Sequence, residues 1–336
     1  MAEQIVEVVR GTVVESRHRV HAAVVDAAGL LRASAGDPEM VTFIRSAAKP
    51  FQALPVIAEG AMERFGITLE EVSVMCGSHS GESRHVDAVT SILRRIGLDG
   101  EALACGPQAP LDREARRALA EAGLEPGRLH NNCSGKHAGM LALARSNGWD
   151  PQGYHLPEHP VQGRMLAEMS RWMDLPPEAM ALGTDGCAAV TVGVPLRSMA
   201  LGFARLAQAA RMGDREPTYV VGSMTSYPEM VGGTGRLCTD LMSCTAGRRF
   251  AKVGAEGVYG VGVPGAELGI AVKIEDGTQR AVGPAILAIL RELDLISEDD
   301  LGALLPYAYP EVVNTRGEVV GQVRPRIDLC GRGVDS

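Results

Sequence analysis

Lysine is the scarcest charged residue in this chain of 336 amino acids. Only four lysines occur, at positions 49, 136, 252 and 273, so the other 29 of the 33 basic residues are arginines. Either residue supplies positive charge at a surface, but only lysine readily loses its proton when buried and then acts as a base or a ligand. Each lysine is therefore a candidate for chemistry, with a leftover surface position as the alternative.

Other features are missing as well, and each absence excludes a class of protein. No basic cluster accompanies the net charge of -8, and two tryptophans, six tyrosines and five phenylalanines leave little for base stacking, so we expect no nucleic-acid partner. No apolar run is long enough to span a bilayer and no signal-like segment opens the chain, so we expect no membrane contact and a cytoplasmic location. The seven cysteines are odd in number and form no Cys-x-x-Cys pair, which disfavours a disulfide framework.

The pattern that remains predicts an α+β fold. Strand-like alternation at residues 5–25 and 312–323 indicates that the two ends of the chain share one antiparallel sheet. Helical periodicity recurs at residues 83–96, 112–122, 134–145, 161–173, 195–210 and 284–293. We therefore expect a sheet from about residues 1–45 and 249–328, packed against a helical lobe of about 46–248. Residues 1–330 are expected to form a single domain, followed by a tail at 331–336.

A serine and a lysine three residues apart follow a strand-like segment. Residues 45–50 read Arg-Ser-Ala-Ala-Lys-Pro, and Pro50 fits the first turn of a helix, where no intrahelical acceptor awaits its missing N–H. Lys49 would then lie on the same face as Ser46, so its amine is predicted to reach the serine hydroxyl and take its proton. A single Ser-x-x-Lys match leaves an ordinary serine N-cap as the alternative.

Two further segments could contribute to a polar pocket. Residues 76–82 place Ser78, His79 and a second serine between glycines, although a capping turn explains them equally well. Lys252 follows an expected strand and precedes Gly254, like the Lys-x-Gly strand of Ser-x-x-Lys hydrolases. Residues 260–265 match Gly-x-Gly-x-x-Gly, but a strand-like segment follows instead of a helix, so we predict a turn and no dinucleotide site.

Thiols and nitrogen donors cluster in two other segments. Cys133 and Lys136 stand at an expected helix start, and Cys187 lies in a tight turn two residues after Asp185. Two thiolates plus nitrogen are compatible with zinc, and a helix N-terminus lowers the pKa of a nearby thiol. No short ligand pair matches a known zinc module, so two buried thiols remain the alternative.

Together these blocks resemble the serine-lysine asparaginases of rhizobial type, the asparaginase II-like family. The matching blocks occur in family order from about residue 5 to 328, and residues 132–140 are the most specific of them. The resemblance implies a single catalytic domain similar to serine β-lactamases and glutaminases, and it suggests a homodimer. It also implies two serine–lysine pairs, Ser46 with Lys49 and Ser78 with Lys252, and a zinc site at Cys133, Lys136 and Cys187.

The implied reaction is hydrolysis of the side-chain amide of L-asparagine, a small-molecule substrate. Ser46 would attack with Lys49 as base, while Ser78 and Lys252 protonate the leaving amine or position water. The expected substrate-binding residues are Arg45, His79, Asn132 and Asp185. Ser78 as nucleophile, a β-lactamase-like or esterase-like hydrolase, and a non-catalytic protein that binds zinc or an amino acid all remain open.

Two positions depart from these patterns. Residues 188–190, Ala-Ala-Val, stand where the family leads us to expect a small residue and a proline after Cys187, which puts the fit of the substrate in question. Lys273 matches no motif and lies in a strand-like segment before an Asp-Gly turn, so we predict that it faces solvent.

Overall fold

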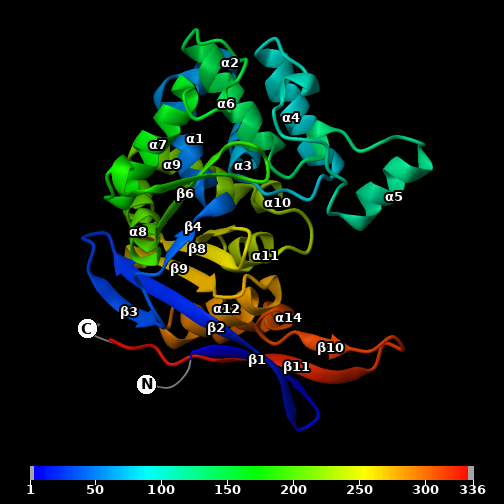
Figure 1. The fold of residues 1–336 in the computed structure, drawn as a ribbon, viewed down its shortest axis with the longest axis vertical. Coiled ribbons are helices and arrows are strands. Elements are labelled where there is room, and N and C mark those ends of the chain that lie inside the picture. The colour runs from blue at the N-terminus through cyan, green and yellow to red at the C-terminus, as the bar shows by residue number, and fades with distance from the viewer. Residues whose placement is uncertain (1–3, 332–336) are drawn as a thin grey trace.

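Both ends of the chain enter one large antiparallel sheet, which occupies the lower half of Figure 1. The structure is a computed structural model that describes residues 4–331, so 332–336 of the expected tail lie outside the described residues. The strand order is β10-β11-β1-β2-β9-β8-β7, with β3 also paired to β2. The strands are β1 (Ile5–Arg10), β2 (Val13–Asp26), β3 (Leu31–Ala35), β7 (Phe250–Val253), β8 (Val258–Val263), β9 (Leu268–Ile274), β10 (Glu311–Val313) and β11 (Val319–Arg326). Because β1 pairs with β11, the predicted sharing of one sheet by the two ends is confirmed.

Helices cover both faces of this sheet, and β8 is consequently buried along its whole length. Helix α8 (Leu196–Met212) packs on β2, β8 and β9, and α12 (Val282–Glu292) packs on β1, β8, β9 and β11. A Cβ added at Gly260 would lie 2.3 Å from the ring of Phe203, and one at Gly262 would lie 2.1 Å from the ring of Phe250. The Gly-x-Gly spacing thus makes room for two rings on a strand, where the sequence predicted a turn.

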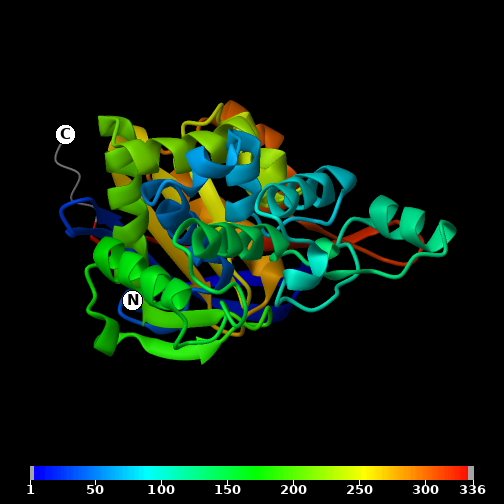
Figure 2. The ribbon, with the colours of Figure 1, turned by 90° about the horizontal axis from the view of Figure 1, so that it is seen from above.

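The helical lobe occupies the upper half of Figure 1. Its other helices are α1 (Lys49–Ala58), α2 (Ala61–Phe65), α3 (Leu69–Cys76), α4 (Ser83–Arg95), α5 (Arg113–Glu121), α6 (Ser134–Ser146), α7 (Pro160–Met173), α9 (Arg215–Ser226), α10 (Pro228–Val231) and α11 (Leu237–Cys244). Short helices α13 (Glu298–Ala303) and α14 (Leu305–Ala308) follow α12 beside the sheet. Viewed from above in Figure 2, α5 projects away from the rest of the lobe. The six predicted helices are confirmed to within about two residues at each end.

A second, three-stranded sheet was not predicted. It has the order β4-β6-β5, from β4 (Val41–Phe43), β5 (Ala181–Thr184) and β6 (Val190–Pro195). Strands of three to six residues are too short for alternation to stand out from the surrounding sequence. This sheet places the segment after β4, because the backbone N–H of Ile44 donates to Val192 O over 2.9 Å.

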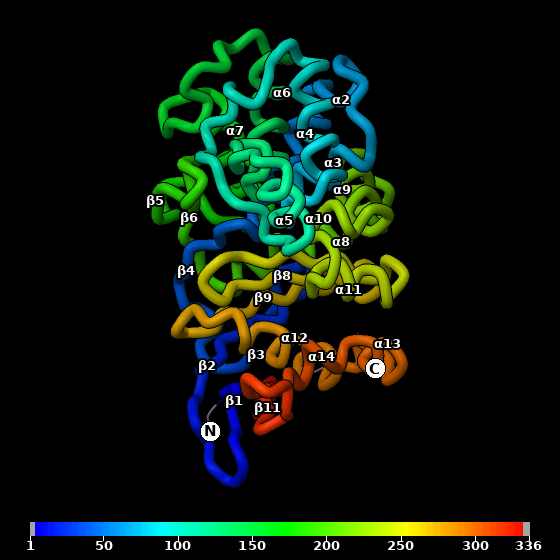
Figure 3. Tube along the Cα trace, turned by 90° about the vertical axis from the view of Figure 1, so that its right-hand side faces the viewer, coloured from blue at the N-terminus to red at the C-terminus, as the bar shows by residue number. Residues whose placement is uncertain are grey.

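One contiguous apolar core runs through sheet and lobe, from Val6 to Leu329. Figure 3 shows the β1–β2 hairpin extending from the end of the molecule opposite the helical lobe. No helix among residues 4–331 is both long and apolar enough to cross a membrane.

Candidate active site

Ser46 lies in a short 3₁₀ helix, Arg45–Ala48, that runs directly into α1. Pro50 occupies the first turn of α1, as predicted from its missing N–H. Arg45 has a φ of 52°, a left-handed conformation that is uncommon outside glycine, and its Nε donates to Asp185 Oδ1 over 2.7 Å. The ion pair between strand ends of the small sheet therefore holds the residue before Ser46 in a strained conformation.

Ser78 stands in the loop that joins α3 to α4. Its backbone N–H donates to Val231 O over 2.8 Å, and a Cβ on Gly77 would lie 2.6 Å from Met230 O. Only glycine therefore allows this loop to approach the end of α10 so closely. The Ser78 side chain is 6% exposed.

Two buried lysine amines converge on the Ser78 hydroxyl. Lys252 Nζ lies 2.8 Å from Ser78 Oγ and Lys49 Nζ lies 3.0 Å from it. Lys49 Nζ also contacts Gly77 O at 2.5 Å and Asn132 O at 3.2 Å. Ser46 is not among the hydrogen-bond partners of this amine within residues 4–331, so the predicted contact between Lys49 and Ser46 is absent. The amine instead spans from α1 to the neighbouring loop.

Lys252 is the more unusual of the two amines. It is fully buried on β7, and burial together with the nearby charge of Lys49 lowers its pKa to about 7. Its Nζ donates to Val253 O over 2.8 Å. Near neutral pH a large fraction of this amine is therefore uncharged and able to accept a proton from Ser78.

The predicted metal-binding side chains also converge. Lys136 Nζ lies 2.9 Å from Cys187 Sγ, and all three side chains are at most 5% exposed. The hydrogen bond between the two thiols lowers the pKa of Cys133 well below its ordinary value and raises that of Cys187. Burial alone would lower the pKa of Lys136, but the adjacent Cys187 and Cys133 raise it. No group of three or more His, Cys, Asp and Glu side chains in residues 4–331 is arranged for a metal, so a site here depends on the lysine.

Two glycines explain why the most specific motif can bring these groups to Ser78. Gly135 and Gly139 lie one turn apart on α6, where α6 crosses α3. A Cβ at Gly135 would lie 2.2 Å from Val74 O, and one at Gly139 would lie 3.0 Å from Met75 Sδ. The two helices therefore approach closely, which brings the start of α6 near the loop that carries Ser78.

The Asp185 carboxylate accepts hydrogen bonds from Arg45 and from the backbone N–H of Gly186. Burial alone would raise its pKa, but the charge of Lys136 and the hydrogen bond from Arg45 lower it, so the carboxylate is ionised. Ala188, in the segment that departs from the family pattern, has a φ of 71° and donates its N–H to Asp185 O. The turn is thus closed without the expected proline, by a residue in the left-handed region.

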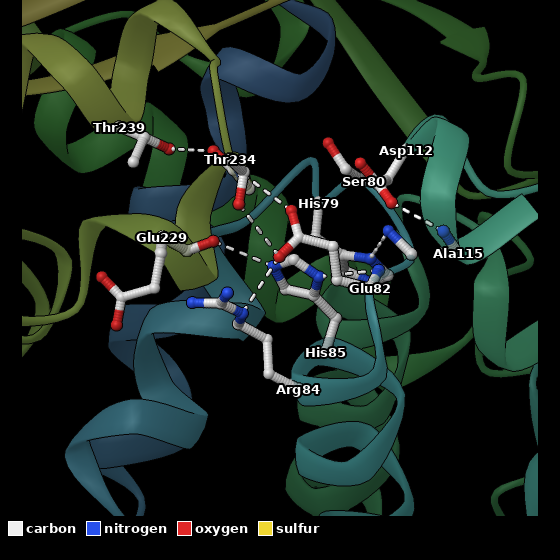
Figure 4. Close-up of polar contacts among 12 residues, drawn as sticks. His79, Ser80, Glu82, Arg84, His85, Asp112, Ala115, Glu229, Thr234 and Thr239 are labelled. Carbon is white, nitrogen blue, oxygen red and sulfur yellow. Dashed lines mark hydrogen bonds and ion pairs between the residues drawn. The ribbon is translucent and has the colours of Figure 1, made fainter. Parts of the chain in front are cut away.

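His79 lies beside His85 and Glu82 in a group of polar side chains, as Figure 4 shows. It is fully buried, its Nε2 lies 2.9 Å from Ser134 Oγ, and its ring stacks on His85 at 4.8 Å. Glu82 joins the same network and accepts from the backbone N–H of Thr234 over 2.7 Å. Burial lowers the pKa of His79 well below its ordinary value, so the ring is neutral. Its contacts are with other side chains of the protein and it is not on the described wall of the cavity, so the predicted contact of His79 with substrate stays a prediction.

An open cavity of about 590 Å³ lies in front of the two serines. Its wall includes Ser46, Ser78, Asn132, Arg236, Glu256, Tyr259 and Tyr307. The last four were not predicted from the sequence. Glu256 lies four residues after Lys252, so its position beside that lysine could have indicated it. Arg236 belongs to no motif, and only the folding of the chain brings it to the cavity wall.

Lys273 is buried, and the prediction that it faces solvent is wrong. Only 7% of it is exposed, and its amine donates to the carbonyls of Glu256, Ile274 and Glu275. The prediction took a position close to an Asp-Gly turn to be exposed, but β9 is buried on both faces from Gly269 to Ile274. Lys273 thereby ties β9 to the loop after Lys252, which forms part of the cavity wall.

Replacing Lys273 with methionine should lower the free energy of unfolding by about 1 to 3 kcal/mol, because buried carbonyls lose a charged donor. Lys273→Arg should also destabilise the protein, since a guanidinium does not fit the space of an amine. Urea unfolding measures both, with Arg117→Lys on the exposed face of α5 as the matched control. If both variants unfold at the same urea concentrations as wild type, the hydrogen bonds of Lys273 do not stabilise the protein and this prediction is wrong.

Comparison with known proteins identifies the family of this chain. The family model of L-asparaginase II matches residues 6–325. A search of curated proteins found no match. Among similar solved structures is Mglu in its native form, at 16% identity, 84% coverage of this chain and a TM-score of 0.47; this chain covers 66% of the Mglu chain, slightly less than two thirds.

Two further solved structures are similar at lower scores. A β-lactamase from Mycobacterium bovis has 15% identity, a TM-score of 0.44, and coverage of 81% of this chain and 94% of its own. An octameric penicillin-binding protein homologue from Pyrococcus abyssi has 14% identity, a TM-score of 0.42, and coverage of 82% and 73%. Because the family model spans nearly the whole chain, the protein belongs to the L-asparaginase II family.

Proposed function

We propose that this protein hydrolyses the side-chain amide of L-asparagine through a serine acyl-enzyme. The observation that supports this best is the meeting of two serines and two buried lysine amines at one cavity, with the pKa of Lys252 brought to about 7. Such a site provides a nucleophile and a neutral base without a cofactor.

In this proposal Ser46 Oγ attacks the carbon of the carboxamide. Ser46 is the more exposed of the two serines on the wall, as a nucleophile that must meet substrate requires. Its proton passes to Lys49, whose amine must turn toward Ser46 as the complex forms. Ser78, held between Lys49 and Lys252, delivers a proton to the leaving nitrogen as the C–N bond breaks and ammonia departs. Lys49 returns its proton to Ser78. Water then cleaves the ester and loses a proton through Ser78 to the neutral amine of Lys252, and that proton restores the Ser46 hydroxyl as aspartate departs.

Ser78 is the second candidate nucleophile, and the contacts of its hydroxyl favour it. Both amines lie within 3.0 Å of Ser78 Oγ, whereas neither contacts Ser46 within the described part of the chain. A nucleophile normally has its base within hydrogen-bond reach, although such bonds often tighten only when substrate binds. The position of a trapped acyl group distinguishes the two.

The charged ends of the substrate need partners on the cavity wall. Arg45 and Asp185 were expected to serve, but they are paired with each other at 2.7 Å and do not line the cavity. Arg236 and Glu256 do line it and carry opposite charges. We therefore propose Arg236 for the α-carboxylate and Glu256 for the ammonium group of the amino acid.

Zinc is the proposed resident metal, held by Cys133, Lys136 and Cys187. The donors fit this ion because two sulfurs and one nitrogen converge in a buried cluster, with Lys136 Nζ 2.9 Å from Cys187 Sγ. When bound, zinc would supply a positive charge that orients the substrate. Asn132 connects the cluster to the cavity, since its Oδ1 accepts from the Cys133 thiol over 3.0 Å while the residue also lines the wall.

Gently purified protein should carry close to one zinc ion per chain. Cys133→Ala and Cys187→Ala should lose it, and so should Lys136→Arg, because a guanidinium has no lone pair to offer. Elemental analysis measures the content, and Cys105→Ala, at a buried thiol outside this set, is the matched control. Wild-type protein without zinc would leave the two cysteines as ordinary buried thiols.

A coupled ammonia assay tests the function itself. Asparagine should be hydrolysed with a higher kcat/KM than glutamine, because an extra methylene displaces the carbonyl from a fixed serine; such discrimination is worth about 1 to 3 kcal/mol. Nitrocefin turnover without ammonia release would instead indicate a β-lactamase-like hydrolase. Tight binding of asparagine with no turnover would indicate a non-catalytic binding protein.

A further inference from the structure

Arg249 is a buried guanidinium that has no counterpart in the mechanism. It immediately precedes β7 and is 8% exposed. Its Nε and Nη1 atoms have no hydrogen-bond partner among residues 4–331. A buried charged donor without an acceptor is costly, so this is an unusual state for a folded protein.

The side chain lies on the wall of a separate cavity of about 510 Å³. This cavity lies between the start of β7 and the segment that joins α12 to α13, and its described lining shares no residue with that of the catalytic cavity. Three arginines line it, at positions 248, 249 and 291. A wall with this composition favours an anion.

Two carboxylates of this wall form ion pairs with the other two arginines. Arg248 pairs with Asp300 at 2.6 Å, and Arg291 pairs with Glu298 at 3.1 Å. Asp294, which is exposed, also lines the cavity, but no ion pair joins it to Arg249 in the described residues. One buried positive charge is therefore left over.

Electrostatics agrees with this geometry. Burial and the adjacent charge of Arg248 lower the pKa of Arg249, although a guanidinium still remains protonated at neutral pH. A planar fork with free N–H groups matches the oxygens of a carboxylate or a phosphate, which can accept two parallel hydrogen bonds.

We propose that Arg249 is the inner contact of a binding site for a small oxyanion, a phosphate or a carboxylate, at the start of β7. The anion neutralises the buried charge and accepts from the nitrogens that lack partners. The site is independent of the amidohydrolase function.

Thermal melting with inorganic phosphate and with acetate tests the proposal, with sodium chloride at equal ionic strength as the reference. Wild-type Tm should rise with anion concentration and saturate, as expected for a ligand that binds only the folded protein. Saturation by phosphate alone or by acetate alone identifies the chemistry that the site prefers. A failure of both to raise the Tm would overturn the proposal.

Arg249→Met shows whether the rise belongs to this site. Removing an unpaired buried charge should leave the Tm in chloride equal to wild type or higher, so this variant is expected to fold. Its Tm should no longer respond to phosphate or acetate. An equal rise in wild type and Arg249→Met would mean that the anions act on the whole protein surface, and the site would be refuted.

The variant Asp294→Asn distinguishes binding of an external anion from neutralisation of Arg249 by Asp294. If an external anion binds, removing the exposed carboxylate from the wall should tighten phosphate binding severalfold and leave the Tm in chloride unchanged. A lower Tm in chloride together with loss of the phosphate response would show that Asp294 itself neutralises Arg249. That result would also refute the proposal.

Discussion

Ser46→Ala is expected to lower kcat by about four to six orders of magnitude while leaving the fold intact. The reason is that loss of a serine nucleophile removes the acyl-enzyme pathway altogether. Binding of aspartate should persist, because the proposed contacts with the charged ends come from Arg236 and Glu256 on the cavity wall. Ammonia release measures the first effect, and calorimetric titration of aspartate measures the second.

The matched control is Ser91→Ala on α4, at a serine that does not line the cavity and is expected to behave as wild type. Ser78→Ala adds the decisive comparison. If Ser46 is the nucleophile, slowed deacylation in Ser78→Ala should allow an acyl adduct to be detected on Ser46 by peptide mass spectrometry. An adduct found on Ser78 in Ser46→Ala would exchange the two roles.

Lys252→Arg is expected to lower kcat by at least about two orders of magnitude, the usual contribution of a positioned general base. A guanidinium keeps its proton near pH 7 and so cannot accept one from Ser78. In wild type, kcat should rise with pH through about 7 where cleavage of the acyl-enzyme limits turnover, because the reactive form of Lys252 is the neutral amine. The residual activity of Lys252→Arg should not show this rise with pH.

The free energy of unfolding should also depend on pH through Lys252. The pKa of Lys252 is lowered from 10.5 to about 7 in the folded protein, so between these values the unfolded chain holds more protons. Stability should therefore rise with pH across that window, and Lys252→Met should lack this part of the rise. Arg117→Lys is again the matched control for both readouts. A fully active Lys252→Arg with an unchanged pH profile would contradict the role of Lys252 as base.

Much of the fold could be predicted because its signals are local. Alternation along residues 5–25 and 312–323 predicted the shared sheet, and helical periodicity predicted six helices near their observed ends. The small sheet escaped prediction because β4 has only three residues and β5 only four. Elements this short are specified by the partners they meet in space, and no pattern along the chain records those partners.

All four of the scarce lysines are buried, and three of them lie close to hydroxyl or thiol groups. Lys49, Lys136 and Lys252 all lie in the buried cluster around the two serines and the two thiols. Lys273 is buried too, but its amine meets three backbone carbonyls and no reactive group. The scarcity of lysine therefore indicated that each amine is buried. A buried amine can stabilise the fold as well as take part in catalysis.

The sequence by itself determined which chemical groups this protein owns and where its helices and long strands begin. Tertiary structure alone decided which groups meet. Lys49 was expected to serve Ser46 three residues away, yet its amine contacts Ser78, because the α3–α4 loop is held against α1 by glycines and by the end of α10. A hydrogen bond is decided by distances within about 3 Å, and such distances between segments far apart in the chain follow from packing, which short-range sequence patterns do not encode.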